Sequence, residues 1–137
     1  MKEIELRTKV VDSEKITINL GPIDLGQIDL LVQEGFYANR TDLIRTAIRN
    51  QIASHAEAVR QTVMRKSLVL GLQHFSRSDL EAVRQAGQML QIRVLGMASI
   101  DSDVTPELAQ ETIESITVLG AFHASPAVKA ALAGRIR

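Results

Sequence analysis

Polar and apolar residues alternate strictly along residues 15–20, which read Lys-Ile-Thr-Ile-Asn-Leu. This period of two, in a segment rich in β-branched residues, predicts a strand with one buried face. The apolar positions, which would face a core, are Ile16, Ile18 and Leu20. The polar positions, which would face solvent, are Lys15, Thr17 and Asn19. Gly21-Pro22 ends the strand, because proline has no backbone donor for a ladder.

Two helical patterns follow this strand. The first has apolar positions at Leu25, Ile28, Leu31 and Val32 and is expected to end at Gly35. The second begins at Asn39-Arg40-Thr41-Asp42, where Asn39 or Thr41 is the expected N-cap. No Gly or Pro interrupts the chain between there and Gly71, so we expect one continuous helix to about Arg65. Beyond Ala53 its apolar pattern thins, which is typical of a linker helix.

A single strand with two helices cannot form a stable domain by itself. The strand leaves both edges unpaired, and the segment 14–54 is too short to bury its own apolar faces. A second copy must therefore supply a partner strand and the rest of the core. We expect an α+β fold that is an obligate homodimer, with an intermolecular antiparallel two-stranded ribbon.

The segment from residue 14 to about 54 resembles the ribbon-helix-helix family of DNA-binding proteins, the Arc, MetJ, CopG and NikR type. The resemblance is carried by the alternating strand 15–20, the helix with Leu25, Ile28 and Leu31, and the segment 35–42 that opens into Ile44, Arg45 and Ile48. It implies a dimeric transcriptional regulator that binds double-stranded DNA through its ribbon.

The chemistry of this ribbon suits the major groove, which presents a distinct donor and acceptor pattern for each base pair. We expect base readout by Lys15, Thr17 and Asn19. The start of the second helix offers free backbone N–H groups to a phosphate. We expect phosphate contact by Asn39, Arg40 and Thr41. Arg45 and Arg49 are left out of the site, because arginines on a helix surface are usually solvated or paired, here with Asp42.

A different organisation begins near Ser67, where a short motif occurs three times. Val-Leu-Gly stands at residues 69–71, 94–96 and 118–120, at spacings of 25 and 24. Each copy lies in an apolar run and precedes a helix start. The expected starts are a capping box over Ser78–Glu81 and the pairs Thr105-Pro106 and Ser125-Pro126. Short strands that alternate with helices must pair in parallel, so we expect a small α/β repeat domain similar to leucine-rich repeats.

These patterns divide the chain into four parts. They are an N-terminal arm (1–13), the ribbon-helix-helix domain (14–54), a helical linker (55–66) and the three-unit β/α repeat domain (67–137). The end strands of so short a repeat array stay exposed unless something covers them. We therefore expect residues 67–137 to mediate a higher homo-oligomer.

Composition narrows the function further. The chain has 16 basic and 16 acidic residues, so any nucleic-acid contact must be local. It has no cysteine, no long apolar span and no visible signal peptide, so a cytoplasmic protein without membrane contact is expected. Motifs for catalysis are missing, and we expect no enzyme. His74 and His123 occupy matching repeat positions too far apart to share one ion, so no metal or other cofactor is expected.

The residues are most consistent with a transcriptional regulator that represses by occluding a promoter. Two alternatives stay open. In one, the chain is an antitoxin that regulates its own operon, and the region after Ala53 wraps a toxin partner. In the other, the chain is a self-assembling scaffold whose ribbon dimerises it without touching DNA.

Overall fold

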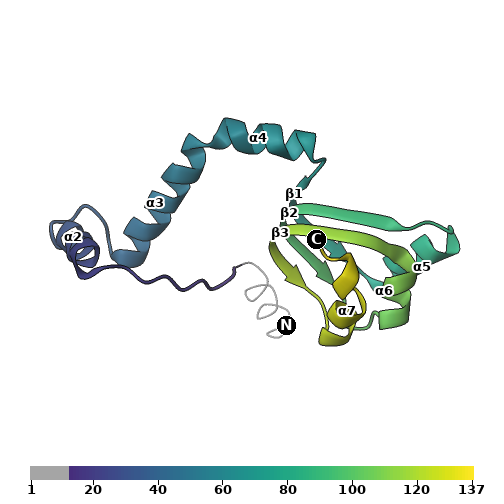
Figure 1. Cartoon of the computed structure of the whole chain (residues 1–137). Coiled ribbons are helices and arrows are strands. Elements are labelled where there is room, and N and C mark those ends of the chain that lie inside the picture. The colour runs from purple at the N-terminus through teal and green to yellow at the C-terminus, as the bar shows by residue number, and fades with distance from the viewer. Residues whose placement is uncertain (1–12) are drawn as a thin grey trace. The chain divides into compact units, whose positions relative to one another are not determined.

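The computed structural model describes residues 13–137, so the expected arm over residues 1–13 lies almost wholly outside the described residues. The chain divides into two compact units, one that extends to Val59 and one from Arg60 to Arg137. The first contains α2 (Pro22–Gln33), α3 (Arg40–Ser54) and the start of α4 (Ala56–Arg65). The second contains three strands and three further helices, with a short 3-10 turn over Ala133–Arg135 (Figure 1).

Local sequence explains the limits of α2. Gly21 precedes it in an extended conformation, and Pro22 occupies the first helical position, where its missing N–H costs nothing. At the other end Gly35 adopts φ +85°, a left-handed conformation that favours glycine. The N–H groups of Gly35 and Phe36 donate to the carbonyls of Val32 and Leu31, which satisfies two carbonyls at the helix end. The expected stop at Gly35 is therefore confirmed.

The expectation of one continuous helix from the segment Asn39–Asp42 to about Arg65 is wrong. α3 ends at Ser54, and α4 begins at Ala56 after a turn at His55 with φ −106° and ψ 15°. The Ser54 hydroxyl donates to the Gln51 carbonyl at 2.6 Å. A serine hydroxyl that bonds a backbone carbonyl in this way competes with the helical ladder and tends to bend it.

Parallel pairing in the second unit is confirmed. β1 (Val69–Phe75), β2 (Leu90–Ile100) and β3 (Ile113–His123) form a parallel sheet in the order β1-β2-β3. The three Val-Leu-Gly copies lie in register across it. β2 and β3 each span 11 residues and are longer than the short strands expected from the apolar runs. Their extra positions include the buried Ile100 and Ile113 as well as exposed polar residues such as Gln91 and Glu114.

The three connecting helices are α5 (Arg77–Gln85), α6 (Pro106–Thr112) and α7 (Pro126–Ala131). Thr105 and Ser125 cap α6 and α7 as expected, by accepting from the N–H groups of Leu108 and Val128. The capping box of α5 begins two residues earlier than expected. It joins Ser76 to Asp79, because the Ser76 hydroxyl accepts from Asp79 N–H and the Asp79 carboxylate accepts from Ser76 N–H.

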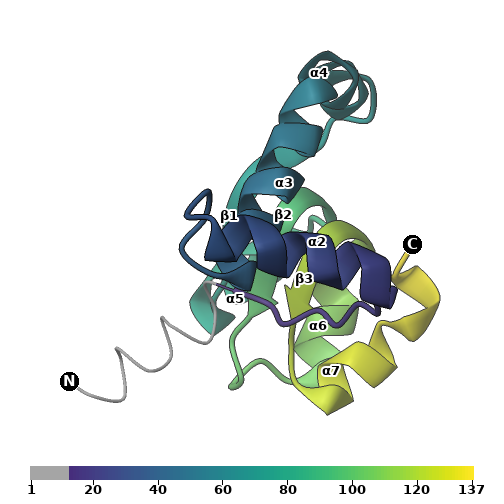
Figure 2. The ribbon, with the colours of Figure 1, turned by 90° about the vertical axis from the view of Figure 1, so that its left-hand side faces the viewer.

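The helices that follow the strands of this unit lie on one face of the sheet. α5, α6 and α7 form one layer of helices beside the three strands (Figures 1 and 2). The buried cluster joins residues of the strands, such as Ile92 and Ile116, to residues of the helices, such as Leu80 and Leu108. On the other face the in-register positions Leu70, Leu95 and Leu119 follow one another across the sheet.

Three glycines let these strands pack closely. Gly71, Gly96 and Gly120 are in register and have φ values of 130°, 140° and 126°. A Cβ atom on Gly96 would collide with the carbonyl oxygen of Gly71, and one on Gly120 would collide with that of Gly96. Nothing lies near the equivalent position on Gly71. The repeated Gly is therefore a steric requirement at two of its three occurrences.

Candidate nucleic-acid interface

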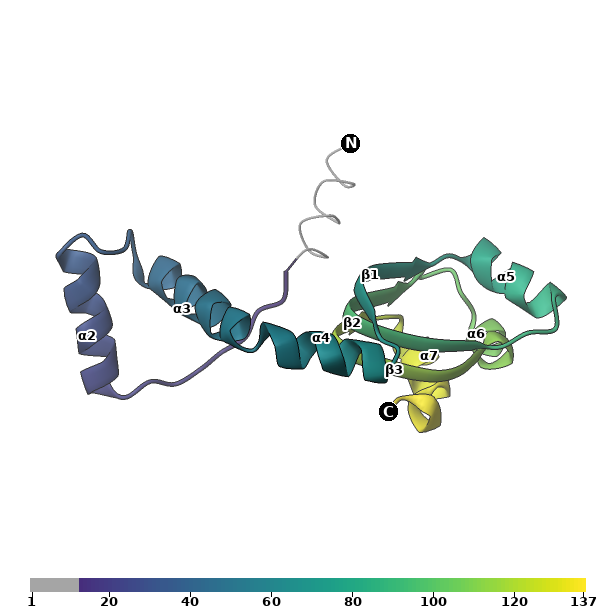
Figure 3. The same cartoon turned by 90° about the horizontal axis from the view of Figure 1, so that it is seen from above.

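Residues 15–20 are extended and pair with no strand of the described chain (Figure 3). Their apolar side chains are exposed to an unusual degree, with Ile16 at 73% and Ile18 at 57%. Lys15, Thr17 and Asn19, which were expected to read bases, are exposed at the alternate positions. The segment thus carries one apolar and one polar set of side chains, and neither set is covered within residues 13–137.

The helices behind this segment do not enclose a core. None of the described residues from 13 to 59 is buried. α2 and α3 contact one another, and Leu25, Ile28 and Ile44 are half-buried, whereas Ile48 and Ile52 remain exposed along α3. Because folded domains bury their large aliphatic side chains, residues 13–59 need further apolar surface beyond their own.

The start of α3 is built as an N-cap. Asn39 Oδ1 accepts from Asp42 N–H at 2.8 Å, and Asp42 Oδ2 accepts from Ala38 N–H at 2.9 Å. Of the two candidates, Asn39 is therefore the capping residue. The backbone N–H groups of Arg40 and Thr41 form no hydrogen bond within residues 13–137. They are the donors that a helix N-terminus offers to an anion.

A hollow of about 330 Å³ lies against this helix start. It is lined by Asn39, Thr41, Asp42, Arg45, Thr46 and Arg49. Neither Arg45 nor Arg49 forms an ion pair with any described residue, and Asp42 is occupied by the cap. Of the two expected states of these arginines, solvated or paired with Asp42, the structure has the solvated one, although both line the hollow. Their spacing of four, which places both on one helix face, was the available signal.

Arg40 does not line the hollow. Its Nε and Nη2 donate to the two carboxylate oxygens of Asp29 at 2.7 and 2.8 Å, so the pair ties the start of α3 to α2. The hydrogen bonds from Arg40 hold the pKa of the Asp29 carboxyl below its ordinary value. Arg40 Nη1 donates no hydrogen bond to any residue from 13 to 137 and remains available to an anion.

The structure brings only part of the expected site together. Asn39 and Thr41 share one hollow, whereas Arg40 points to Asp29. No hydrogen bond joins Lys15, Thr17 or Asn19 to these residues within the described part of the chain. Both sets are exposed, as contact with DNA requires.

The second unit contains His74 and His123, which occupy matching positions of the repeat. His74, Ser99 and His123 are in register across the sheet. His74 Nδ1 lies 2.7 Å from Ser99 Oγ, and its Nε2 lies 2.9 Å from Asp101 Oδ1. The described residues contain no group of three or more side chains suited to a metal ion. Among residues 13–137, no helix combines the length and apolar character needed to cross a bilayer.

Comparison with known proteins gives one match. The model of the ribbon-helix-helix transcriptional regulator family matches residues 11–129 and so covers most of both units. Searches of curated proteins and of solved structures found no match.

Proposed function

Since this chain belongs to the ribbon-helix-helix transcriptional regulator family, we propose that it binds double-stranded DNA as a homodimer and represses transcription by occluding a promoter. The observation that carries this proposal is the segment 15–20, with apolar residues on one side, polar residues on the other, and no strand partner within the described chain.

A second copy would complete the first unit. Two antiparallel copies of residues 15–20 would form a ribbon, with Ile16, Ile18 and Leu20 of both chains turned toward the helices. The absence of buried residues between 13 and 59 supports this arrangement, because the exposed Ile48 and Ile52 would gain partners in the same core. Burial of an Ile side chain stabilises by about 1.5–3 kcal/mol, so several such side chains per chain favour the dimer strongly.

The opposite face of the ribbon would enter the major groove. Asn19 is suited to a bidentate contact with adenine, and Lys15 to the acceptors of guanine. Thr17 offers a hydroxyl to either and a methyl group to thymine. With two chains, six side chains would contact base edges, and each good contact discriminates by roughly 1–3 kcal/mol.

Phosphate groups would bind where α3 begins. The free N–H groups of Arg40 and Thr41 lie beside Asn39 at the positive end of the helix, and Arg45 and Arg49 add two unpaired charges to the same hollow. Arg40 would serve in two ways, because its Nε and Nη2 hold Asp29 while Nη1 remains for a phosphate. One such site in each chain would fix the register of the ribbon on the duplex.

The repeat domain, residues 67–137, would join these dimers into a higher homo-oligomer. Parallel sheets are almost always covered on both faces, yet Leu70 is 72% exposed, Leu72 68% and Leu119 50%. The three strand-helix units, with their helices in one layer, support a small array similar to leucine-rich repeats. The buried cluster of this unit favours a folded assembly domain over an antitoxin tail that wraps a toxin.

The test replaces Lys15 and Asn19 together with Ala in the full chain. Genomic fragments selected by the wild-type protein serve as probes for fluorescence anisotropy. We expect the variant to lose at least 30-fold in affinity, while its solution mass stays that of the wild type. The matched control, Lys129→Ala with Gln85→Ala, removes one Lys and one amide from the second unit and should bind normally.

Two results would overturn the proposal. If the wild-type chain selects no fragment and binds all duplexes equally, the chain is a scaffold and not a sequence-specific regulator. If the K15A/N19A variant keeps its affinity and its preference among fragments, the ribbon is not the reading element.

A further inference from the structure

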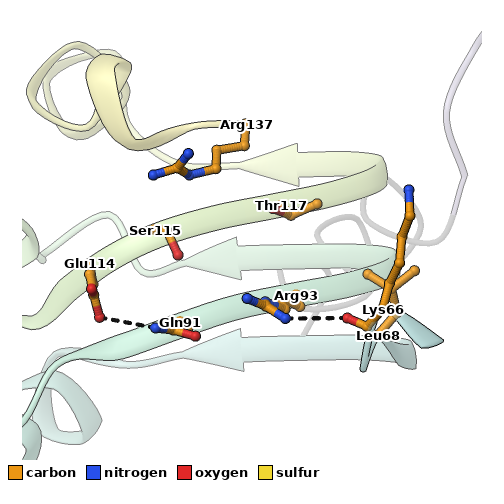
Figure 4. Close-up of a pocket in the computed structure, with 8 residues that line it drawn as sticks. All are labelled: Lys66, Leu68, Gln91, Arg93, Glu114, Ser115, Thr117 and Arg137. Carbon is orange, nitrogen blue, oxygen red and sulfur yellow. Dashed lines mark hydrogen bonds between the residues drawn. The ribbon is translucent and has the colours of Figure 1, made fainter. Parts of the chain in front are cut away.

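We propose that the second unit contains a binding site for a small phosphate-bearing molecule, separate from the DNA interface. The site is a hollow of about 380 Å³ on the face of the sheet opposite the helices. It is lined by Lys66, Leu68, Gln91, Arg93, Glu114, Ser115, Thr117 and Arg137 (Figure 4). All of these residues belong to the unit from Arg60 to Arg137, so the inference does not depend on DNA binding.

The strand register assembles this hollow. Gln91 lies opposite Ser115, and Arg93 lies opposite Thr117 on the neighbouring strand. Residues two apart on a strand share a face, so the hollow continues directly into the row that contains the half-buried Leu95 and the exposed Leu119. The polar hollow and the apolar row are thus neighbouring parts of one open face.

The C-terminal segment adds the third cation. Ile136 forms a parallel bridge with Ile116, and Arg137 N–H donates to the Ile116 carbonyl at 2.8 Å. This pairing sets Arg137 alongside β3. Figure 4 shows its guanidinium extended above Ser115 and Thr117. The arginine thus reaches the hollow through backbone pairing and not through a flexible tail.

The charges of this hollow are not balanced by the protein. Lys66, Arg93 and Arg137 form no ion pair with any residue from 13 to 137. In the same unit, Arg77 pairs with Glu81, and Arg84 with Glu111. Three uncompensated cations around one hollow raise the local potential and favour a bound anion.

The single acid in the lining does not cancel this charge. Glu114 accepts from the side-chain amide of Gln91 at 3.2 Å, which holds it at one end of the hollow (Figure 4). The side chains of the lining, three basic and one acidic, sum to a formal charge of +2. A ligand that matches it carries about two negative charges, as a phosphate monoester does at neutral pH.

The donors also fit phosphate oxygens. Arg93 Nη1 donates to the Lys66 carbonyl at 3.4 Å, so its Nε and Nη2 remain free for a bidentate contact. The hydroxyls of Ser115 and Thr117 add donors on the floor between the two arginines. The volume lies within the ~300–1,000 Å³ range of small-molecule sites, large enough for a phosphate with an attached group.

The experiment uses the full chain and sodium pyrophosphate as the probe, followed by isothermal titration calorimetry and by amide shifts in NMR spectra. We expect saturable binding, with shifts at Gln91, Arg93, Ser115 and Thr117. Arg93→Gln with Arg137→Gln should weaken it at least tenfold. The control pair Arg77→Gln with Arg84→Gln removes the same charge elsewhere and should change it less than twofold.

A second variant keeps the test valid if the first is misfolded. Arg93→Lys with Arg137→Lys retains the charge and removes only the planar fork, so we expect a three- to tenfold loss with unchanged thermal unfolding. The proposal is overturned if pyrophosphate does not saturate below 10 mM, if citrate binds and pyrophosphate does not, or if both Gln pairs weaken binding equally. It is also overturned if R93Q/R137Q weakens DNA binding without any added anion, since the hollow would then hold DNA phosphates.

Discussion

At the scale of single residues, the three in-register glycines show that the same residue can be required for different reasons. All three have φ between 126° and 140°, where a side chain is strained. Only Gly96 and Gly120 also have a neighbouring carbonyl oxygen in the place of a Cβ atom. The repeat predicted the importance of these positions, but the steric difference between them depends on strand order.

We therefore expect unequal effects of Ala in the three positions. Gly71→Ala should cost about 1–3 kcal/mol of unfolding free energy through backbone strain alone. Gly96→Ala and Gly120→Ala should each cost about 1–3 kcal/mol more, because the clash is with backbone that cannot turn aside. Urea unfolding followed by circular dichroism measures this order. Equal losses at all three positions would contradict it.

The role of Arg40 as the partner of Asp29 could not be predicted from the residues next to it in sequence. They are 11 positions apart, and only the packing of α2 on α3 joins them. A free Arg at a helix start looks like a phosphate ligand, whereas the structure gives it a bidentate carboxylate partner. Sequence alone could not distinguish a phosphate ligand from a carboxylate partner, because the Arg40–Asp29 pair is a tertiary contact.

This pair predicts a dependence on pH. Since the folded-state pKa of Asp29 is lowered, the pair stabilises the protein above the unfolded pKa of the carboxyl, and that stability is lost as the pH falls through the folded-state value. Asp29→Asn should lower the thermal midpoint at neutral pH and flatten its decline below about pH 4. Asp24→Asn, on the same helix but outside the pair, is the control. A decline as steep in D29N as in the wild type would contradict the assignment.

At the scale of elements, the caps of α6 and α7 were predictable and that of α5 was only partly so. Thr105-Pro106 and Ser125-Pro126 each mark a single position, because proline fixes the first helical residue. Before α5 the sequence Ser-Arg-Ser-Asp offers two serines, and both have an acid three residues later. Ser76 is the N-cap, since β1 ends at Phe75 and the helix follows directly.

The two serines can be separated by mutation. Ser76→Ala removes the acceptor for Asp79 N–H and also the hydrogen bond that helps to lower the pKa of Asp79, so it should cost about 1 kcal/mol. Ser78→Ala removes one exposed hydroxyl contact, to Ser76, and should cost less than about 0.5 kcal/mol. Thermal unfolding of both variants measures the difference. The reverse order would place the cap at Ser78.

In the whole molecule, the first unit lacks a buried core among its described residues and the second lacks cover on one sheet face. Residues 13–59 contain no buried side chain, whereas the unit from Arg60 has a core but one open sheet face. The first deficit was predictable, because an alternating strand with no second strand nearby implies a partner. The hollow at Arg93 was not, because it needs two in-register strands and a C-terminal residue brought back by a bridge.

We expect these deficits to produce two separable association steps. Ile18→Asp should abolish the ribbon and lower the solution mass to that of an assembly joined only through the repeat domain. Leu70→Glu with Leu119→Glu should leave a dimer, because it alters only the open sheet face. Light scattering after size-exclusion chromatography reports both masses. The scheme is wrong if I18D leaves the mass unchanged, or if the Leu pair is identical to the wild type at every concentration.

The three in-register glycines make the two edges of the sheet unequal as places to add a further strand-helix unit. Each strand accommodates the backbone of the strand that precedes it in sequence, so the constraint passes from β1 toward β3 and never in the reverse direction. If a further unit were grafted before β1, Gly71 would already provide the space that the backbone of the new strand needs. A unit grafted after β3 would have to bring its own glycine and displace Ile136 from its bridge. Lengthening of this array is therefore simpler at its first strand than at its last.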